Sequence, residues 1–241
     1  YLVPTLYHDL LRAERFTRTD ISSVRKLGFA GAPMHDALLL QLDQAFRPEL
    51  FVNHYGSSEV YTFSIHQRAA AKPGSAGRAG LNTRLRVVKL DHTDPDLLAA
   101  PGEEGQIVAD LLGDEAFEGY HRRPDANAKS LHGGWYFTGD TGYVDAEGDL
   151  FVTGRVDDMI IRGGENIAPA EIEAVLHSHG GVEEAAVVGL ADEEWGQVVG
   201  AAVVPRPGVV LDVAELVQFC RARLASYKVP QVVRVCEQLP H

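Results

Sequence analysis

The sequence predicts a parallel α/β unit with an antiparallel β extension, followed by a small α+β unit. Three observations carry this prediction. Strand and helix patterns alternate up to about residue 73, short strands separated by Gly and Pro turns continue to residue 154, and helices accompany a few strands over 155–241. A length of 241 residues accommodates one large or two modest domains. We therefore expect a domain boundary between residues 154 and 155.

The first part of the chain alternates helices and strands in an order that favours parallel pairing. Apolar residues at helical spacing predict helices over residues 4–11 and 36–46. Buried strands are expected at residues 26–30 and 50–55, each followed by a glycine. Strands joined through a helix pair in parallel by a right-handed crossover, so we expect a parallel sheet with helical crossovers.

The middle of the chain changes character near Gly74, where short strands with turn residues between them begin. Residues 84–90 and 106–111 are expected to pair antiparallel. Further short strands are predicted at 135–138, 141–144 and 149–153. We interpret residues 74–154 as a small β-barrel subdomain.

The last part of the chain has the pattern of a small domain with helices on one face of a sheet. Helices are expected at residues 169–177 and 213–224, the first opening with a proline that suits its first turn. Strands are predicted at 159–161, 182–190, 198–205 and 231–235. The sequence ends at His241 without a closing element, so we expect this domain to be truncated.

Composition excludes several classes of protein. The formal net charge of −12 argues against a general nucleic-acid-binding protein, which needs a clustered basic surface. Cys220 and Cys236 form no metal-binding or disulfide pattern, which favours a reducing, cytoplasmic setting. No apolar run is long enough to span a bilayer. Because the chain opens at Tyr1 rather than Met, we expect it to be a segment of something longer.

The first segment with chemical character is Asn53–Glu59, at the end of a predicted strand. It combines the aromatic face of Tyr55, a permissive glycine, two hydroxyls and the carboxylate of Glu59. This set could stack a purine, hydrogen-bond a phosphate and hold a divalent cation. A plain polar turn is the alternative. A serine-hydrolase elbow is excluded because Val60 stands where that motif needs glycine.

The second segment is Trp135–Asp140, again at a strand end. The carboxylate of Asp140 follows Gly139 and could accept hydrogen bonds from both hydroxyls of a ribose. The alternative is an Asx turn, in which the side chain serves only its own backbone.

The third and fourth segments lie in the last part of the chain. In Gly154–Ile167, Arg155 offers a planar set of donors, Asp157 lies where the composition changes, and two glycines allow close approach of a ligand to the backbone. A β-hairpin with a glycine turn is the alternative. In the fourth segment, Trp195 among charged residues could offer a stacking face or cap the core of the small domain.

These four segments, in this order and at these separations, resemble the adenylate-forming superfamily of acyl-CoA synthetases, luciferases and peptide-synthetase adenylation domains. The resemblance covers the whole chain and is strongest to 4-chlorobenzoate-CoA ligase-like acyl- and aryl-CoA ligases. It implies the C-terminal part of a large AMP-binding domain over 1–154 and a small mobile domain from 155.

The resemblance implies a set of nucleotide contacts. Tyr55 would stack on adenine, and the backbone of Gly56 would approach the adenine edge. Ser58, where the family usually has Thr, would contact the α-phosphate. Asp140 would hold the ribose hydroxyls, and Arg155 would support the ribose or the phosphate.

The resemblance also implies catalytic and acceptor residues. Glu59 would bind Mg²⁺ and act with Ser58 and Arg155 in adenylation, and Asp157 would be the hinge of the mobile domain. The implied coenzyme A contacts are Gly163, Gly164, Glu165, Trp195 and Lys228. The implied lining of the acyl pocket is Gly31, Ala32, Pro33 and Val60.

The activity implied is ATP-dependent formation of an acyl-adenylate from a carboxylic acid, then of its CoA thioester, with AMP and pyrophosphate released. ATP, Mg²⁺ and coenzyme A are the implied cofactors. Loading of a carrier protein, a luciferase-like oxygenase and a non-catalytic nucleotide-binding module are the alternatives. An aryl acid is expected before a fatty acid, and a homodimer is left open. The phosphate loop of the missing N-terminal half and the catalytic lysine beyond His241 are absent, so this segment alone is expected to be inactive.

Overall fold

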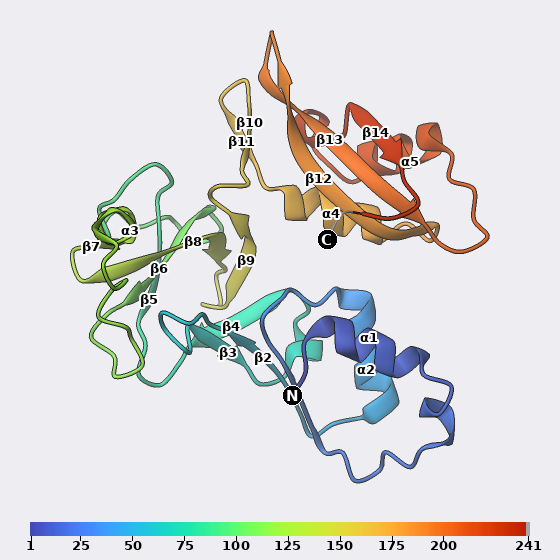
Figure 1. Cartoon of the computed structure of the whole chain (residues 1–241), viewed down its shortest axis with the longest axis horizontal. Coiled ribbons are helices and arrows are strands. Elements are labelled where there is room, and N and C mark those ends of the chain that lie inside the picture. The colour runs from blue at the N-terminus through green and yellow to red at the C-terminus, as the bar shows by residue number, and fades with distance from the viewer. Residues whose placement is uncertain (240–241) are drawn as a thin grey trace. The chain divides into compact units, whose positions relative to one another are not determined.

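The computed structural model describes residues 1–239, and the chain divides after Val152 into two compact units. Figure 1 shows the helices and strands of both units along the chain. The end of the small domain at residues 240–241, expected to be truncated, lies outside the described residues. No helix among residues 1–239 is long and apolar enough to cross a membrane.

The first unit begins with the α/β arrangement that the sequence predicts. Helix α1 (Pro4–Arg12) is followed by β1 (Lys26–Phe29), α2 (Asp36–Phe46) and β2 (Leu50–Tyr55), with a short 3₁₀ helix at Phe16–Arg18. Strands β1 and β2 pair in parallel, with Lys26 opposite Leu50. Their shared core consists of Tyr7, Leu27, Phe29, Met34, Leu39, Leu42, Phe51 and Ala69. The predicted helical crossover is therefore confirmed.

The sheet continues from β2 through antiparallel strands. Its order is β1-β2-β3-β4-β9-β8-β6-β5, with β7 paired to β8. The added strands are β3 (Ser64–His66), β4 (Ser75–Ala79), β5 (Leu85–Val88), β6 (Gly105–Asp110), β7 (Leu131–His132), β8 (Trp135–Val144) and β9 (Leu150–Arg155), with the short helices Ala69–Ala71 and α3 (Pro124–Ser130). The antiparallel pairing of β5 with β6 is confirmed, and the strands follow one open path from β1 to β5.

Two findings in this sheet differ from the sequence prediction. Strands β3 and β4 were not expected, because their residues lack the apolar alternation that marks a half-buried strand. They connect the parallel pair to the antiparallel strands. The two strands expected at 135–138 and 141–144 form the single strand β8, which has an irregular register opposite β6.

The second unit is the small α+β fold that the sequence predicts. Its sheet has the order β11-β10-β13-β12, and β14 pairs in parallel with β13. Helices α4 (Pro169–His177) and α5 (Val213–Arg221) contribute Ile172, Leu176 and Leu216 to one buried core. The strands are β10 (Ile160–Arg162), β11 (Glu165–Ile167), β12 (Val182–Asp192), β13 (Gly196–Pro205) and β14 (Val232–Val235), and a 3₁₀ turn spans Ser226–Lys228.

Candidate functional site

Two of the predicted nucleotide residues meet within the first unit. Tyr55 ends β2, and Asp140 lies in β8, 85 residues further along the chain. The Tyr55 hydroxyl donates a hydrogen bond to the Asp140 carboxylate, and the Tyr55 ring packs against Phe63 with ring centres 4.9 Å apart. Both side chains are half-buried. The sheet thus brings an aromatic ring and a carboxylate together at one place.

The position of Asp140 depends on an irregularity in β8. Register shifts between the pairs Gln106–Thr141 and Val108–Phe137, and Gly139 has φ +78°. The Thr138 hydroxyl donates to the Ile107 carbonyl oxygen at 2.9 Å and accepts from the Asp140 amide at 3.0 Å. An irregular register of this kind re-aims a side chain out of the regular alternation. The Asx-turn alternative concerned the side chain of Asp140 alone. It gave no part to Thr138, whose hydroxyl holds the bend.

The loop after Tyr55 is held by close backbone contacts. A Cβ on Gly56 would lie 1.9 Å from the Tyr61 carbonyl oxygen, so only glycine fits there. The Ser57 hydroxyl accepts from the amides of Glu59 at 3.1 Å and Val60 at 3.4 Å. Ser57 therefore shapes the loop, a role that the sequence prediction missed. Ser58 is exposed on the same loop.

Glu59 is oriented by a tyrosine from a distant loop. The Tyr120 hydroxyl donates to Glu59 Oε1 at 2.8 Å and lies 3.4 Å from the Tyr136 hydroxyl. Burial alone would raise the pKa of Glu59, but hydrogen bonding with Ser57 and Tyr120 outweighs it, and the pKa lies below its usual range. Burial, followed by the contact with Tyr120, raises the pKa of Tyr136 far above its usual range. At neutral pH Glu59 is therefore an ionised carboxylate, and Tyr136 is protonated.

Sequence reasoning missed Tyr120 and Tyr136 as neighbours of Glu59. Tyr136 belongs to the predicted segment 135–140 but received no role. Tyr120 lies in a loop before α3, where a tyrosine next to a glycine cannot be told from a surface residue by pattern alone. Only the fold brings residue 120 to residue 59.

The four residues expected to line an acyl pocket lie in two different settings. Val60 is 1% exposed and packs with Phe63, Ala109 and Tyr136 in the core. Gly31, Ala32 and Pro33 are exposed after β1. Gly31 borders a depression of about 390 Å³ whose other lining residues are Tyr1, Leu2, Val3, Leu6 and Ala30.

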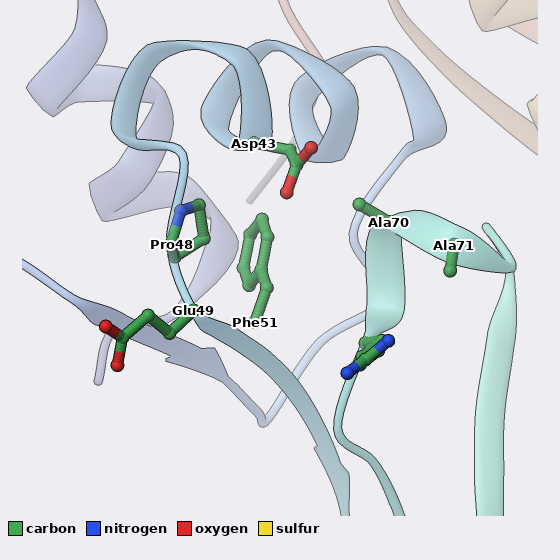
Figure 2. A pocket seen from close by; sticks show the side chains of 7 residues that line it. Asp43, Pro48, Glu49, Phe51, Ala70 and Ala71 are labelled. Carbon is green, nitrogen blue, oxygen red and sulfur yellow. The ribbon is translucent and has the colours of Figure 1, made fainter.

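A second depression lies away from the predicted site. It has a volume of about 400 Å³ and opens at the beginning of β2, whereas Tyr55 ends that strand. Figure 2 shows Asp43 of α2 near the ring of Phe51 in this depression. The other lining residues are Pro48, Glu49, Arg68, Ala70 and Ala71, so no predicted site residue takes part.

Arg155 is the last residue of β9, and Asp157 lies in the tight turn that follows it, near the start of the second unit. The Asp158 amide donates to the Arg155 carbonyl oxygen at 3.2 Å, and the Met159 amide donates to that of Val156 at 3.3 Å. The side chains of Arg155 and Asp157 are both exposed. A short turn close to the boundary of a compact unit is a place where backbone rotation can occur.

The two glycines of the third segment form the turn of a β-hairpin, as the alternative interpretation held. Gly163 and Gly164 have φ +59° and +90°, and they join Arg162 to its cross-strand partner Glu165. Positive φ at both central residues is typical of a two-residue hairpin turn. Glu165 is exposed.

Trp195 rests on this hairpin and does not belong to the core of the small domain. It lies between β12 and β13, is 41% exposed, and its carbonyl oxygen accepts from the Gly163 amide at 2.9 Å. Lys228, the remaining predicted coenzyme A residue, forms an ion pair of 2.6 Å with Glu171. Of the predicted acceptor residues, the fold thus gathers Gly163, Gly164, Glu165 and Trp195 at one hairpin.

Family models match most of the chain. Residues 1–121 match the model described as AMP-binding enzyme, and residues 171–241 match the one described as AMP-binding enzyme C-terminal domain. Similar curated proteins include a 2-succinylbenzoate–CoA ligase from Geobacillus sp., 48% identical over 76% of this chain and 36% of that protein. A feruloyl-CoA synthase from Amycolatopsis is 40% identical over 99% of this chain and 48% of that protein. A 4-chlorobenzoate–CoA ligase from Arthrobacter is 35% identical over 98% of this chain and 44% of that protein.

Solved structures resemble the whole chain as well. The o-succinylbenzoate CoA synthetase of Bacillus subtilis with its acyl-adenylate intermediate has a TM-score of 0.84 at 34% identity, covering 99% of this chain and 47% of that one. The amide bond synthetase of Marinactinospora thermotolerans has a TM-score of 0.89 at 27% identity, and the match covers 99% of this chain and 48% of that one. The chain therefore spans about half the length, or less, of the proteins it matches.

Proposed function

This chain belongs to the AMP-binding enzyme family, and from that premise we propose that it is the C-terminal half of an AMP-forming acyl- or aryl-CoA ligase. The observation that carries the proposal is the meeting of Tyr55 with Asp140 and the oriented carboxylate of Glu59 on the same unit. The similar proteins named as CoA ligases support it.

In the first half-reaction, an oxygen of the substrate carboxylate attacks the α-phosphorus of ATP, and pyrophosphate leaves. The ring of Tyr55 receives the adenine. Asp140 accepts hydrogen bonds from the ribose hydroxyls, which replace the Tyr55 hydroxyl now bonded to its carboxylate. The exposed hydroxyl of Ser58 serves the phosphate.

Glu59 fits the role of a magnesium ligand. It is an ionised, half-buried carboxylate, and Mg²⁺ in nucleotide sites is held by one or two carboxylates together with phosphate oxygens and water. When bound, Mg²⁺ neutralises charge that builds up on the phosphates. Tyr120 keeps Oε1 of Glu59 in place while the carboxylate stays ionised.

In the second half-reaction, the thiolate of coenzyme A attacks the acyl carbon, the acyl–phosphate bond breaks, and AMP leaves. We assign this half to the second unit, which would rotate about Asp157. The bare backbone of Gly163 and Gly164 admits the pantetheine arm, with Trp195 beside it.

Within this proposal, an aromatic acid is the preferred substrate class. The similar ligases are named for succinylbenzoate, feruloyl and chlorobenzoate substrates, and each of these contains an aromatic ring. A fatty acid is second. An amine acceptor in place of coenzyme A is a further candidate, because the amide bond synthetase has the same fold over 99% of this chain.

Two further properties are proposed with the function. Both cysteines are free thiols, which suits a reducing compartment such as the cytoplasm. A homodimer is testable by light scattering of the full-length protein.

The experiment that tests the function uses the full-length gene product with ATP, Mg²⁺ and a panel of aryl and fatty acids. Pyrophosphate release with an aryl acid, followed by CoA thioester formation, is the expected result. D140A should weaken ATP binding about tenfold to a hundredfold, the effect of losing charge-assisted hydrogen bonds.

Two results would count against the proposal. Pyrophosphate release with no acid in the panel would remove the adenylation step, and unchanged ATP affinity in D140A by calorimetry would remove the nucleotide site. Product analysis with an amine in place of coenzyme A decides between thioester and amide formation.

A further inference from the structure

Arg162 and Trp195 form a stacked pair at the exposed end of the second unit. The guanidinium carbon of Arg162 lies 4.6 Å from the centre of the Trp195 ring. Stacking of this kind occupies the face of the guanidinium plane and leaves the N–H donors at its edge available. Two-fifths of Trp195 remains exposed beside it.

The pair is held rigidly by the hairpin and its neighbours. Arg162 pairs with Gly196 across β10 and β13, and Gln197 Oε1 accepts from the Ile161 amide at 2.7 Å. A Cβ on Gly163 would lie 2.8 Å from the Trp195 ring, so the ring lies directly against the turn. A side chain held in this way loses little conformational freedom when it binds a ligand.

In the described part of the second unit, Arg162 has no partner of opposite charge. No hydrogen bond or ion pair joins its guanidinium to another group among residues 153–239, and its buried Nε is unpartnered. Two other basic residues of this unit do have acidic partners: Lys228 pairs with Glu171, and Arg206 with Glu183. A guanidinium without a carboxylate partner keeps its charge available for an anionic ligand.

We propose that Arg162, stacked on Trp195 beside the Gly163–Gly164 turn, is the anchor for the phosphate groups of coenzyme A. A guanidinium binds phosphate oxygens through paired N–H donors, and the glycine turn leaves room for the ligand beside it. This inference rests on the proposed function for the identity of the ligand. The charge and the open donors define the chemistry, which is a phosphate or diphosphate anion.

The residues that directly follow Lys228 in the chain supply no further positive charge. Val229 and Gln231 stand there. Val229 is buried in the core, and Lys228 is already in its ion pair. Arg162 supplies a positive charge that this part of the chain does not provide.

The test compares R162M with the wild type in the full-length enzyme, using acceptors with successively fewer phosphates. Methionine keeps the apolar contact with Trp195 and removes the charge. The KM for coenzyme A should rise about tenfold to a hundredfold, whereas the KM for pantetheine should change less than about twofold. Dephospho-CoA, which lacks the 3′-phosphate, shows which group is bound. With this acceptor, the rise in KM from wild type to R162M disappears if Arg162 holds the 3′-phosphate and persists if Arg162 holds the diphosphate.

The matched control is R223A, because Arg223 is also stacked on an aromatic ring, Phe219, but donates to the Phe219 carbonyl oxygen at 3.1 Å. R223A should leave the KM for coenzyme A unchanged. Quenching of Trp195 fluorescence by coenzyme A, identified by its loss in W195F, measures binding without turnover, and its Kd should rise in R162M by the same factor as KM.

The outcomes separate this inference from the proposed function. Equal KM increases for coenzyme A and pantetheine, or equal affinities of R162M and the wild type for coenzyme A, would overturn the inference. A wild-type enzyme that binds coenzyme A through Arg162 but never consumes it would overturn the function and leave the binding site standing.

Discussion

The Tyr55–Asp140 region of the first unit and the Arg162–Trp195 region of the second are assembled in opposite ways. The first joins residues from β2 and β8, and its groups are half-buried and hydrogen-bonded to one another. The second is built on one hairpin and the adjacent turn, and its cation has no bonded partner among residues 153–239. The first region therefore depends on the register of a long sheet, and the second on the geometry of two glycines.

This difference agrees with the ligand proposed for each region. A site that must distinguish one nucleotide is preorganised by hydrogen bonds that also stabilise the sheet. A site that receives a long, flexible acceptor can lie on a surface turn, provided that its charge is left unneutralised. Changes in the first region should thus affect folding and function together, and changes in the second should affect function with little effect on the first unit.

The largest expected effect is that of Gly56→Ala, which tests whether the first region tolerates any movement. The added Cβ would meet the Tyr61 carbonyl oxygen at 1.9 Å, so the loop must shift. We expect a loss of about 3 kcal/mol in the free energy of unfolding, in the range of severe steric changes. Urea denaturation measures it. Gly180→Ala, where the Cβ meets nothing within 4 Å, is the control and should be close to neutral.

Tyr120→Phe removes the hydroxyl that orients Glu59 and tests whether hydrogen bonding in the first region serves catalysis. The lost bond to a charged acceptor corresponds to about 1.5–3 kcal/mol. We expect adenylation to fall about tenfold or more and the Mg²⁺ concentration for half-maximal activity to rise. Tyr61→Phe, a tyrosine that is 68% exposed, is the control. An unchanged Mg²⁺ requirement in Tyr120→Phe would show that Tyr120 is only structural.

Gly163→Ala examines the second region by itself. The new Cβ would lie 2.8 Å from the Trp195 ring at φ +59°, so the hairpin and the ring must separate. We expect a loss of about 1–2 kcal/mol in the free energy of unfolding of the second unit, together with weaker coenzyme A binding. Nucleotide affinity, measured by calorimetry with ATP, should be unchanged. A fall in ATP affinity as large as the fall in coenzyme A affinity would contradict the claim that the two regions act independently.

The smallest effect is expected at an ion-pair cluster in the first unit that shares no residue with either region. Lys72 Nζ lies 2.5 Å from Asp145, 2.8 Å from Glu147 and 2.7 Å from Asp149. Hydrogen bonding with Lys72 lowers the pKa of Asp145 and Asp149. Carboxyls with lowered pKa stabilise the fold above their unfolded pKa, and this contribution is lost as pH falls through their folded pKa.

Lys72→Met should therefore lower Tm by a few degrees at pH 7, as for the loss of a surface ion-pair network. The difference from the wild type should shrink steadily between pH 5 and pH 3. Scanning calorimetry over this pH range measures it. A difference that is constant with pH would mean that Lys72 acts through its contact over the Phe151 ring rather than through its ion pairs.

Local patterns were sufficient for the features that depend on neighbours in the chain. Leucines at helical spacing predicted α2, an initial proline helped to predict α4, and the alternation of strands and helices predicted the parallel pairing of β1 with β2. The family resemblance singled out Tyr55 and Asp140, which the fold brings into contact. These features depend on side-chain periodicity and short motifs, which a single sequence displays directly.

Tertiary structure alone decided what depends on residues far apart in the chain. Strands β3 and β4 form because neighbouring strands pair with them, although their own residues have no strand pattern. Tyr120 reaches Glu59 across 61 positions, and Arg162 reaches Trp195 although β11, α4 and β12 lie between them in the chain. Val60 was expected at a pocket and lies in the core. The sequence by itself determined which residues can do chemistry, and the sheet decided which of them meet, because contact between distant residues depends on register and packing that no local pattern records.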